Sequence, residues 1–129
     1  MRCLSRIIQV KTVAAGSGIS YGHTYITDRE TKIAVLPIGY SDGLFRTMSN
    51  RAEVLIRGQR APVRGRICMN MCMADISTIE NVAVGDEVVI LGSQGAETID
   101  ADQIGEWSDT ISYEVLCALG NNNQREFLS

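Results

Sequence analysis

The chain has 129 residues, of which 45% are hydrophobic and 21% charged, and its formal net charge is -3. This length and composition predict one folded domain with its own core, not a disordered segment. The scattered Lys and Arg residues argue against a nucleic-acid-binding protein, and no apolar run approaches the roughly 18–20 residues that a membrane span needs.

The first two-thirds of the chain predict strands and turns. Residues 1–10 show no apolar h-region followed by a small-residue cleavage site, so we expect a cytoplasmic protein without a signal peptide. Apolar runs and apolar–polar alternation predict about six strands, with turn signals every ten residues or so, which is typical of a barrel or sandwich. The predicted strands are residues 6–13, 31–39, 52–58, 60–69, 71–77 and 84–92.

Three details refine these strands. Pro37 predicts an edge, a bulge or a strand end within 31–39, because proline has no N–H to donate to a ladder. Gly58-Gln59 is a plausible hairpin turn between the third and fourth strands. In residues 71–77, alternation places Cys72, Ala74 and Ile76 on one face.

The last third changes to a helical period. Asp100 followed by Gln103 is a capping-box pattern, which predicts a short helix from Ala101 to about Trp107. A second helix is predicted with Thr110 or Ser112 as its cap. Its apolar residues would be Ile111, Val115, Cys117 and Leu119, with Gly120 as its stop.

The four cysteines, at positions 3, 68, 72 and 117, do not form a metal-binding pattern. Cys68 and Cys72 are four residues apart, which is not a C-x-x-C pair, and the sequence offers no second pair of ligands. We expect buried, reduced thiols and no metal site.

The chain is short of the parts that a self-sufficient enzyme needs. It has one histidine, His23, which we interpret as a structural residue, and two lysines, Lys11 and Lys32, without an apolar pocket sequence around them. It has no nucleophile elbow, dinucleotide-binding glycine motif or Walker lysine motif. The residues therefore predict a β-rich module that contributes to a site completed elsewhere.

Three tyrosines, Tyr21, Tyr40 and Tyr113, stand beside glycine or serine at predicted turns or a helix start. A tyrosine hydroxyl has a pKa near ~10 in water, so it acts as a base near neutral pH only beside a cation or strong donors. Arg66 is a candidate for that cation. On residue type alone, a hydrogen-bonded structural tyrosine is the commoner interpretation of Tyr21.

Five motifs together resemble the C-terminal domain of bacterial alanine racemase, in the same order from about residue 5 to residue 119. They are "SRIIQVKTVAAGSGISYGHTY", "AVLPIGYSDG", "VRGRICMNMCMADIS", "VGDEVVILG" and "TISYEVLCAL". The resemblance implies a mainly β, barrel-like fold with one or two short helices near the C-terminus. It also implies that residues 1–129 are a single domain.

The resemblance further implies partners. In that family, an N-terminal (β/α)8 barrel, absent from this chain, holds pyridoxal 5'-phosphate (PLP) through a lysine. The enzyme is a head-to-tail homodimer, in which this domain closes the active site of the other subunit. Racemisation of alanine, for peptidoglycan synthesis, needs two bases on opposite faces of the substrate, and the cofactor acts as the electron sink. The lysine is one base, and a tyrosine of this domain is the other.

Matched motif by motif, the resemblance assigns a role to each of seven residues. Tyr21 matches the tyrosine that abstracts the α-proton of the L-enantiomer, and Tyr40 matches a tyrosine at the inner gate of the substrate channel. Met69 matches the methionine whose backbone helps bind the substrate carboxylate. The other matches are Arg66 near the catalytic tyrosine, Tyr113 near the cofactor phosphate, Asp42 at a turn or channel, and Asn70 near the channel.

Two departures keep alternatives open. The family's "ICMD" reads "ICMN" here, so Asn70 replaces an acidic residue, which also fits the related serine racemases. The family's closing "RVPR" is replaced by "NNNQREF". We expect a domain cloned or split from a longer protein and inactive alone. The alternatives are a serine racemase domain and a non-catalytic β-barrel binding module.

Overall fold

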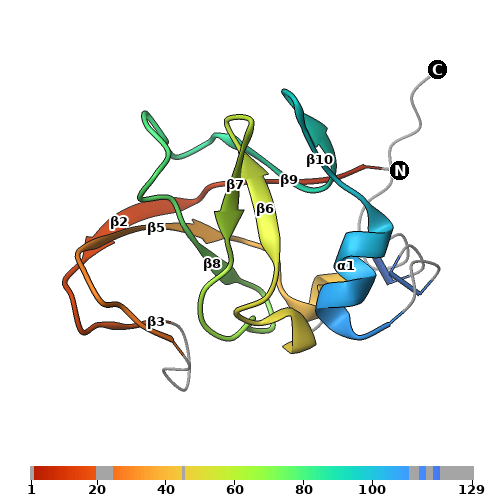
Figure 1. Ribbon diagram of the computed structural model, residues 1–129, viewed down its shortest axis with the longest axis horizontal. Helices are drawn as coiled ribbons and strands as arrows, with labels where there is room; N and C mark the ends of the chain where they lie inside the picture. Colours follow the sequence, from red (N-terminus) through yellow and green to blue (C-terminus); the bar gives the residue numbers. More distant parts are fainter. Residues whose placement is uncertain (1, 20–24, 45, 111–113, 116–117, 120–129) are drawn as a thin grey trace.

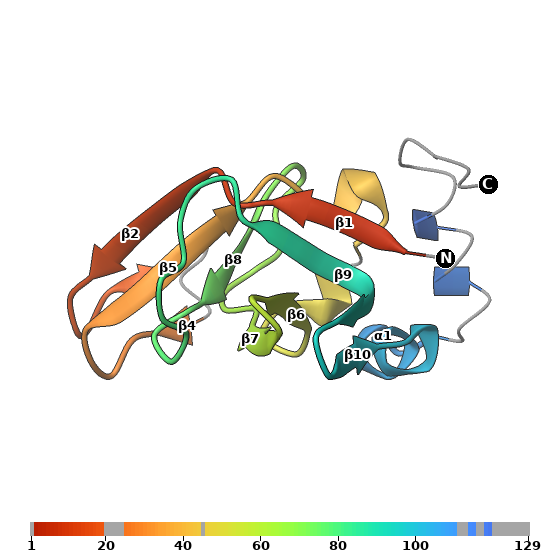
Figure 2. The ribbon, with the colours of Figure 1, turned by 90° about the horizontal axis from the view of Figure 1, so that it is seen from above.

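The computed structural model describes residues 2–19, 25–44, 46–110, 114–115 and 118–119. Its described strands form three antiparallel sheets, and one α-helix follows them (Figure 1). α1 and β10 lie together at one end of the molecule, and β2 and the β3–β4 hairpin lie at the other end (Figures 1 and 2). The mainly β fold expected from the sequence is confirmed, although the described strands do not close into a ring.

The larger sheet is organised around β9 (Glu87–Gln94). It has the order β1 (Cys3–Arg6), β9, β6 (Glu53–Ile56) and β7 (Gln59–Pro62), and β10 (Glu97–Ile99) also pairs with β9. Residues 88–91 of β9 are all buried, which explains their continuous apolar run.

The smaller sheet has the order β2 (Gln9–Val13), β5 (Thr31–Leu36) and β8 (Cys72–Asp75). β5 lies in the centre and ends just before Pro37. Of the three alternatives predicted for Pro37, the strand end is the one found, and residues 37–39 are not part of the predicted 31–39 strand. An isolated bridge between Val63 and Ala74 links the end of β7 to β8. A separate two-stranded hairpin pairs β3 (Gly18–Ile19) with β4 (Tyr25–Ile26).

One hydrophobic cluster joins the two larger sheets. It contains Leu36 from β5, Leu55 from β6 and Val89 from β9, all without exposed surface. In β8 and just after it, Cys72, Ala74 and Ile76 are buried, so the alternation predicted for residues 71–77 is confirmed. This shared core fixes the strands that carry the loops described below.

The helix predicted after Asp100 is confirmed as α1 (Ala101–Ser108). The Asp100 carboxylate accepts from the Gln103 amide at 2.8 Å, and the Gln103 side chain accepts from the Asp100 amide at 3.2 Å. Of the second predicted helix, residues 114–115 and 118–119 are helical, and Val115 and Leu119 are buried. Ile111, Ser112, Cys117 and Gly120 lie outside the described residues.

Three sequence predictions about strands are wrong. Residues 6–13 belong to two strands, because the chain crosses between sheets: the Ile7 amide donates to the Asp86 carbonyl, and the Ile8 amide donates to the Val35 carbonyl. The 60–69 strand ends at Pro62. The hairpin turn is Arg57–Gly58, not Gly58-Gln59. Both turn residues have positive φ, 52° and 77°, as a two-residue type I′ connection requires.

The short strands β3, β4 and β10 were not predicted, since two or three residues show no clear alternation. Within the part of the chain that the structure describes, no helix combines the length and the apolar character that crossing a membrane requires.

Candidate functional site

Two glycine-bounded motifs of the sequence meet in one loop pair. The first loop is a turn of residues 39–43 that contains the 3-10 helix η2 (Tyr40–Asp42), and the second is the connection of residues 66–71 before β8. The Tyr40 amide donates to the Cys68 carbonyl, and the Ser41 amide donates to the Met69 carbonyl, both at 3.0 Å. Two consecutive amides thus bond two consecutive carbonyls, which fixes the two loops against each other.

Asp42 holds the first loop in its turn. Its Oδ2 accepts from the Gly39 amide at 3.0 Å, and the Asp42 amide donates back to the Gly39 carbonyl at 3.0 Å. Gly43 follows with φ of 97°, in the left-handed region that favours glycine. Of the two roles expected for Asp42, these contacts correspond to the turn.

The peptide geometry of the second loop leaves two donors available. A trans peptide points its C=O and N–H in opposite directions. Because the carbonyls of Cys68 and Met69 face the 39–43 turn, the N–H groups of Met69 and Asn70 face away from it. Neither of these two amides has a hydrogen-bond partner among the described residues.

The loop pair carries three of the exposed large hydrophobic side chains among the described residues. Tyr40, Met69 and Met71 are 42%, 52% and 40% exposed, whereas large apolar side chains elsewhere are mostly buried. The Arg46 guanidinium lies 5.7 Å from the centroid of the Tyr40 ring, a cation–π distance that orients the ring.

Residues 49–50, which follow a second turn, hold the 66–71 loop and the residue before it. The Ile67 amide donates to the Ser49 hydroxyl at 2.8 Å, and the Gly65 amide donates to Asn50 Oδ1 at 2.6 Å. Both acceptors follow the 3-10 helix η3 (Arg46–Met48). The loop is therefore held by side chains of residues 49–50 as well as by the backbone of residues 40–41.

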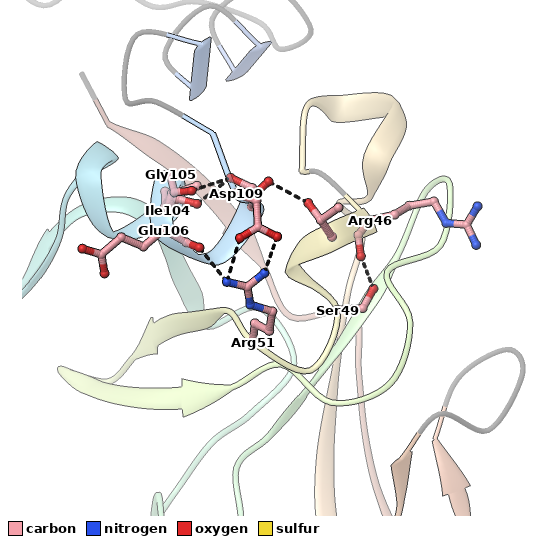
Figure 3. A network of polar contacts seen from close by, with 9 residues as sticks. Arg46, Ser49, Arg51, Ile104, Gly105, Glu106 and Asp109 are labelled. Carbon is pink, nitrogen blue, oxygen red and sulfur yellow. Dashed lines mark hydrogen bonds and ion pairs between the residues drawn. The ribbon is translucent and has the colours of Figure 1, made fainter.

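The same support continues to the helix. Figure 3 shows Arg51 between the end of α1 and the η3 turn, with two nitrogens on the Asp109 carboxylate at 2.8 and 3.3 Å. Arg51 also donates to the Glu106 carbonyl at 2.7 Å, which satisfies one of the free carbonyls at the helix end. Thr47 bonds the Ser108 carbonyl at 3.1 Å. The end of α1 therefore holds residues 47–51, and Ser49 in this segment holds the 66–71 loop.

Tyr21, predicted as the catalytic base, lies outside the described residues, in the chain segment between β3 and β4. The base of this hairpin is well fixed. The buried Thr27 hydroxyl accepts from the Ser17 amide at 2.9 Å and donates to the Ala14 carbonyl at 2.8 Å. The Arg64 guanidinium lies 4.8 Å from the centroid of the Tyr25 ring, so β4 contacts the segment that leads into the 66–71 loop.

Two of the described thiols are buried, Cys3 in β1 and Cys72 at the start of β8. Burial, and secondarily the Asp42 carboxylate, raise the pKa of Cys3 to about 11. Burial, and secondarily Cys68, raise the pKa of Cys72 to about 12. Both groups stay protonated near neutral pH, as expected of buried thiols. Cys68, also expected to be buried, is only partly buried, and Cys117 lies outside the described residues. Throughout the described ranges, no three His, Cys, Asp or Glu side chains are grouped to bind a metal ion.

Of the seven predicted site residues, the structure brings four together: Tyr40, Asp42, Met69 and Asn70. Arg66 is exposed at the start of the same 66–71 loop. Tyr113, like Tyr21, lies outside the described residues, as does His23. Sequence reasoning missed Ser41 and Arg46. A serine and an arginine in a turn carry no signal of their own, because their contacts come from the fold.

The chain is similar to known proteins over nearly its whole length. The family model described as "Alanine racemase, C-terminal domain" matches residues 1–127. An alanine racemase of Halothermothrix orenii is 50% identical over 123 residues, covering 95% of this chain and 32% of the relative. One of Cutibacterium acnes is 48% identical over 122 residues, covering 95% of this chain and 32% of the relative.

Solved structures show the same likeness. The crystal structure of alanine racemase from E. faecalis has a TM-score of 0.87 at 40% identity, covering 94% of this chain and 32% of that chain. The alanine racemase of a D-cycloserine-producing Streptomyces lavendulae has a TM-score of 0.90 at 37% identity, covering 99% and 33%. The chain therefore spans about a third of the length of the proteins that it matches.

Proposed function

The chain belongs to the alanine racemase C-terminal domain family, and from this membership we propose that it supplies one wall of a PLP-dependent alanine racemase active site. The observation that carries the proposal is the loop pair of residues 39–43 and 66–71. This pair combines an exposed tyrosine, Tyr40, with two adjacent backbone amides, those of Met69 and Asn70, which have no hydrogen-bond partner among the described residues. The domain acts together with a PLP-binding (β/α)8 barrel, closing the site of a second subunit in a head-to-tail homodimer in the cytoplasm.

The residues of this chain are suited to line a PLP site but not to bind PLP covalently. PLP, when bound, supplies an electron sink for the negative charge left on the α-carbon by proton removal. A lysine that binds it covalently is activated in a desolvated or cationic setting. Lys32 is exposed on β5, and Lys11 is only partly buried on β2. We therefore assign the cofactor lysine to the barrel domain, and Tyr113 of this chain to the neighbourhood of the cofactor phosphate.

The Met69 amide is suited to the substrate carboxylate. Its N–H faces away from the 39–43 turn and has no partner in the described part of the chain. The Tyr40–Cys68 hydrogen bond fixes the Cys68–Met69 peptide plane, so the donor is held in place before the substrate binds. Tyr40, stacked with Arg46, lines the path to this donor as part of the inner gate.

Tyr21 is assigned as the base that removes the α-proton of the L-enantiomer, and the barrel lysine acts on the opposite face. A tyrosine base near neutral pH needs a positive neighbour, and we assign that role to Arg66. Thr27 and the Tyr25–Arg64 contact hold the strands on both sides of Tyr21, which meets the requirement that a base be held in position.

The test uses this chain assembled with a PLP-barrel domain of the family. Because two enantiomers have equal free energies, Tyr21→Phe must lower kcat/KM equally in both directions. We expect a loss of at least about 100-fold, the usual worth of a positioned base. Exchange of the α-proton with D2O separates the faces: D-alanine should still exchange through the lysine, and L-alanine should not. Wild-type exchange of L-alanine in Tyr21→Phe would contradict the assignment.

Serine is the second candidate substrate, favoured by one observation: the neutral Asn70 side chain lies next to Met69 in the 66–71 loop. The names of the relatives favour alanine. The ratio of kcat/KM for L-alanine and L-serine, measured before and after Asn70→Asp, separates the two. A ratio that does not change would mean that Asn70 does not select the substrate. Assemblies that racemise neither amino acid would favour the non-catalytic binding module.

A further inference from the structure

Resting on the proposed function, we infer that Ser41 is a positioning residue for the substrate carboxylate: with Asn70, it holds the Met69–Asn70 peptide so that two adjacent amides face the carboxylate. The role assigned to Ser41 is to act through the Met69 carbonyl, with no direct contact to the substrate. The inference adds a side-chain pair to the backbone role of Met69, and it explains why an amide at position 70 suits this chain.

The first observation is that the Met69 carbonyl accepts two hydrogen bonds from one residue. The Ser41 amide donates to it at 3.0 Å, and the Ser41 hydroxyl donates to it at 2.7 Å. A carbonyl oxygen has two lone pairs, so Ser41 satisfies both. The peptide plane between Met69 and Asn70 is therefore held from one side by two bonds.

The second observation is that Ser41 Oγ also lies 3.1 Å from the Asn70 side-chain amide, at Oδ1. A hydroxyl has a single hydrogen, and here that hydrogen is engaged by the closer Met69 carbonyl. An Asn70 amide turned by 180° about its Cβ–Cγ bond puts Nδ2 in the same place, where it donates to a lone pair of Oγ. All three groups are then satisfied in one chain of donors: Asn70 to Ser41, and Ser41 to Met69.

An aspartate at position 70 would reverse this arrangement. An ionised carboxylate only accepts, and a hydrogen bond to a charged acceptor is stronger than one to a neutral carbonyl. The Ser41 hydroxyl would turn to the carboxylate and leave the Met69 carbonyl with one donor. Serine at 41 and asparagine at 70 are therefore a matched pair.

The hydrogen bonds to the Cys68 and Met69 carbonyls also determine where the amides of the same two peptides point. The carbonyls of Cys68 and Met69 both face residues 40–41, so the amides of Met69 and Asn70 both face away, and neither has a partner in the described ranges. Consecutive amides that point to the same side form an anion-binding concavity. A carboxylate with two oxygens matches two such donors. We assign the Asn70 amide as the second donor.

The first test measures kcat and KM for L-alanine in the chain assembled with the PLP-barrel domain. Ser41→Ala should raise KM by roughly two- to tenfold, the worth of one ordinary hydrogen bond, and should leave kcat nearly unchanged, since a carboxylate is bound alike in the ground and transition states. Ser41→Thr keeps the hydroxyl and should restore KM. The matched control is Ser93→Ala, which removes an exposed hydroxyl that bonds Thr98 on β10. This control should change neither constant.

A double-mutant cycle tests the pair itself. Asn70→Asp adds a negative charge near the substrate carboxylate whether or not Ser41 is present, so charge repulsion contributes equally in both backgrounds. The Ser41 hydroxyl can be drawn away only where it exists. Asn70→Asp should therefore raise KM more in the Ser41 protein than in the Ser41→Ala protein. Equal effects in both backgrounds would overturn the pairing.

A readout on the chain alone separates this inference from the proposed function. In Ser41→Ala, the backbone amides of positions 40 and 41 should exchange with D2O faster, whereas the β8 amides should keep their rates. If the wild-type assembly does not racemise, the proposed function and the carboxylate role both fail. If it racemises normally but Ser41→Ala leaves KM or the loop exchange unchanged, only the inference about Ser41 is overturned.

Discussion

Gly39 lies so close to the Cys68 carbonyl that a Cβ built on Gly39 would stand 2.1 Å from that oxygen and 2.5 Å from the Met69 oxygen. These acceptors belong to the backbone, which cannot rotate away as a long side chain can. Gly39 has φ of -149° and ψ of -160°, extended backbone that any residue adopts. The glycine is therefore required by the close approach of the two loops and not by its own dihedral angles.

We predict that Gly39→Ala destabilises the chain by about 1–3 kcal/mol or more, because the methyl group forces the two loops apart. Urea unfolding measures the loss. Gly85→Ala is the matched control: its φ is +94° and nothing lies within 4 Å of the added Cβ. It should show only the cost of a left-handed alanine, about 1–2 kcal/mol. Racemase activity should fall in Gly39→Ala and persist in Gly85→Ala. A fully active Gly39→Ala enzyme would contradict the proposed wall.

Thr27→Val should destabilise the hairpin that carries the Tyr21 segment. The valine keeps the shape but leaves the Ser17 amide without its acceptor, which costs about 1–3 kcal/mol, while the Ala14 carbonyl keeps the Ser17 hydroxyl as a donor. Thr27→Ser keeps the hydroxyl and loses one methyl group, so it should cost about 1 kcal/mol or less. Chemical denaturation and amide exchange at Ser17 measure the difference. Equal stabilities for the two variants would show that the hydroxyl contributes little.

Arg51→Ala should release the end of α1 from the η3 turn. The side chains of Arg51 and Asp109 are 43% and 71% exposed. Because water screens an exposed ion pair, its contribution to the free energy of unfolding is about 0.5–1 kcal/mol. Arg51→Lys keeps the charge but not the two-pronged geometry, so it should recover only part of the loss. Arg29→Ala, which removes a 4.0 Å contact to Asp28, is the control and should have no effect. An Arg51→Ala chain as stable as the control would refute the bracing role.

The buried thiols predict a loss of stability in alkali. The pKa values of Cys3 and Cys72 are raised to about 11 and about 12 in the folded chain, from an ordinary value of 9.0. Between pH 9 and pH 12, the folded state binds more protons than the unfolded state. The stability of the folded state is therefore unaffected by these thiols below pH 9 and falls as the pH rises toward 12. Urea midpoints between pH 8 and 11 should decline less steeply in Cys3→Ala/Cys72→Ala than in wild type. Parallel declines would show that other groups control this range.

The strands of the core were predictable because their signal is local. Of the run predicted over residues 31–39, residues 31–36 form β5 and residues 33–36 are buried on both faces, and the alternation of residues 71–77 reflects burial on one face. The Asp100–Gln103 box likewise predicts the start of α1 within its own turn of chain. The sheet change between Ile7 and Ile8 was not predictable, because it depends on Asp86 and Val35, which are distant in sequence.

By itself, the sequence determined the β-rich class and the first turn of α1. It also determined the family motifs and, with them, the candidate site residues. Each of these depends on neighbours along the chain. The tertiary structure alone decided that residues 40–41 bond to residues 68–69, and that Ser41, 28 residues away, holds the Met69 carbonyl. Backbone hydrogen bonds between two loops leave no side-chain pattern to recognise. They form only because β5 and β8 lie side by side in one sheet and carry the two loops to the same place.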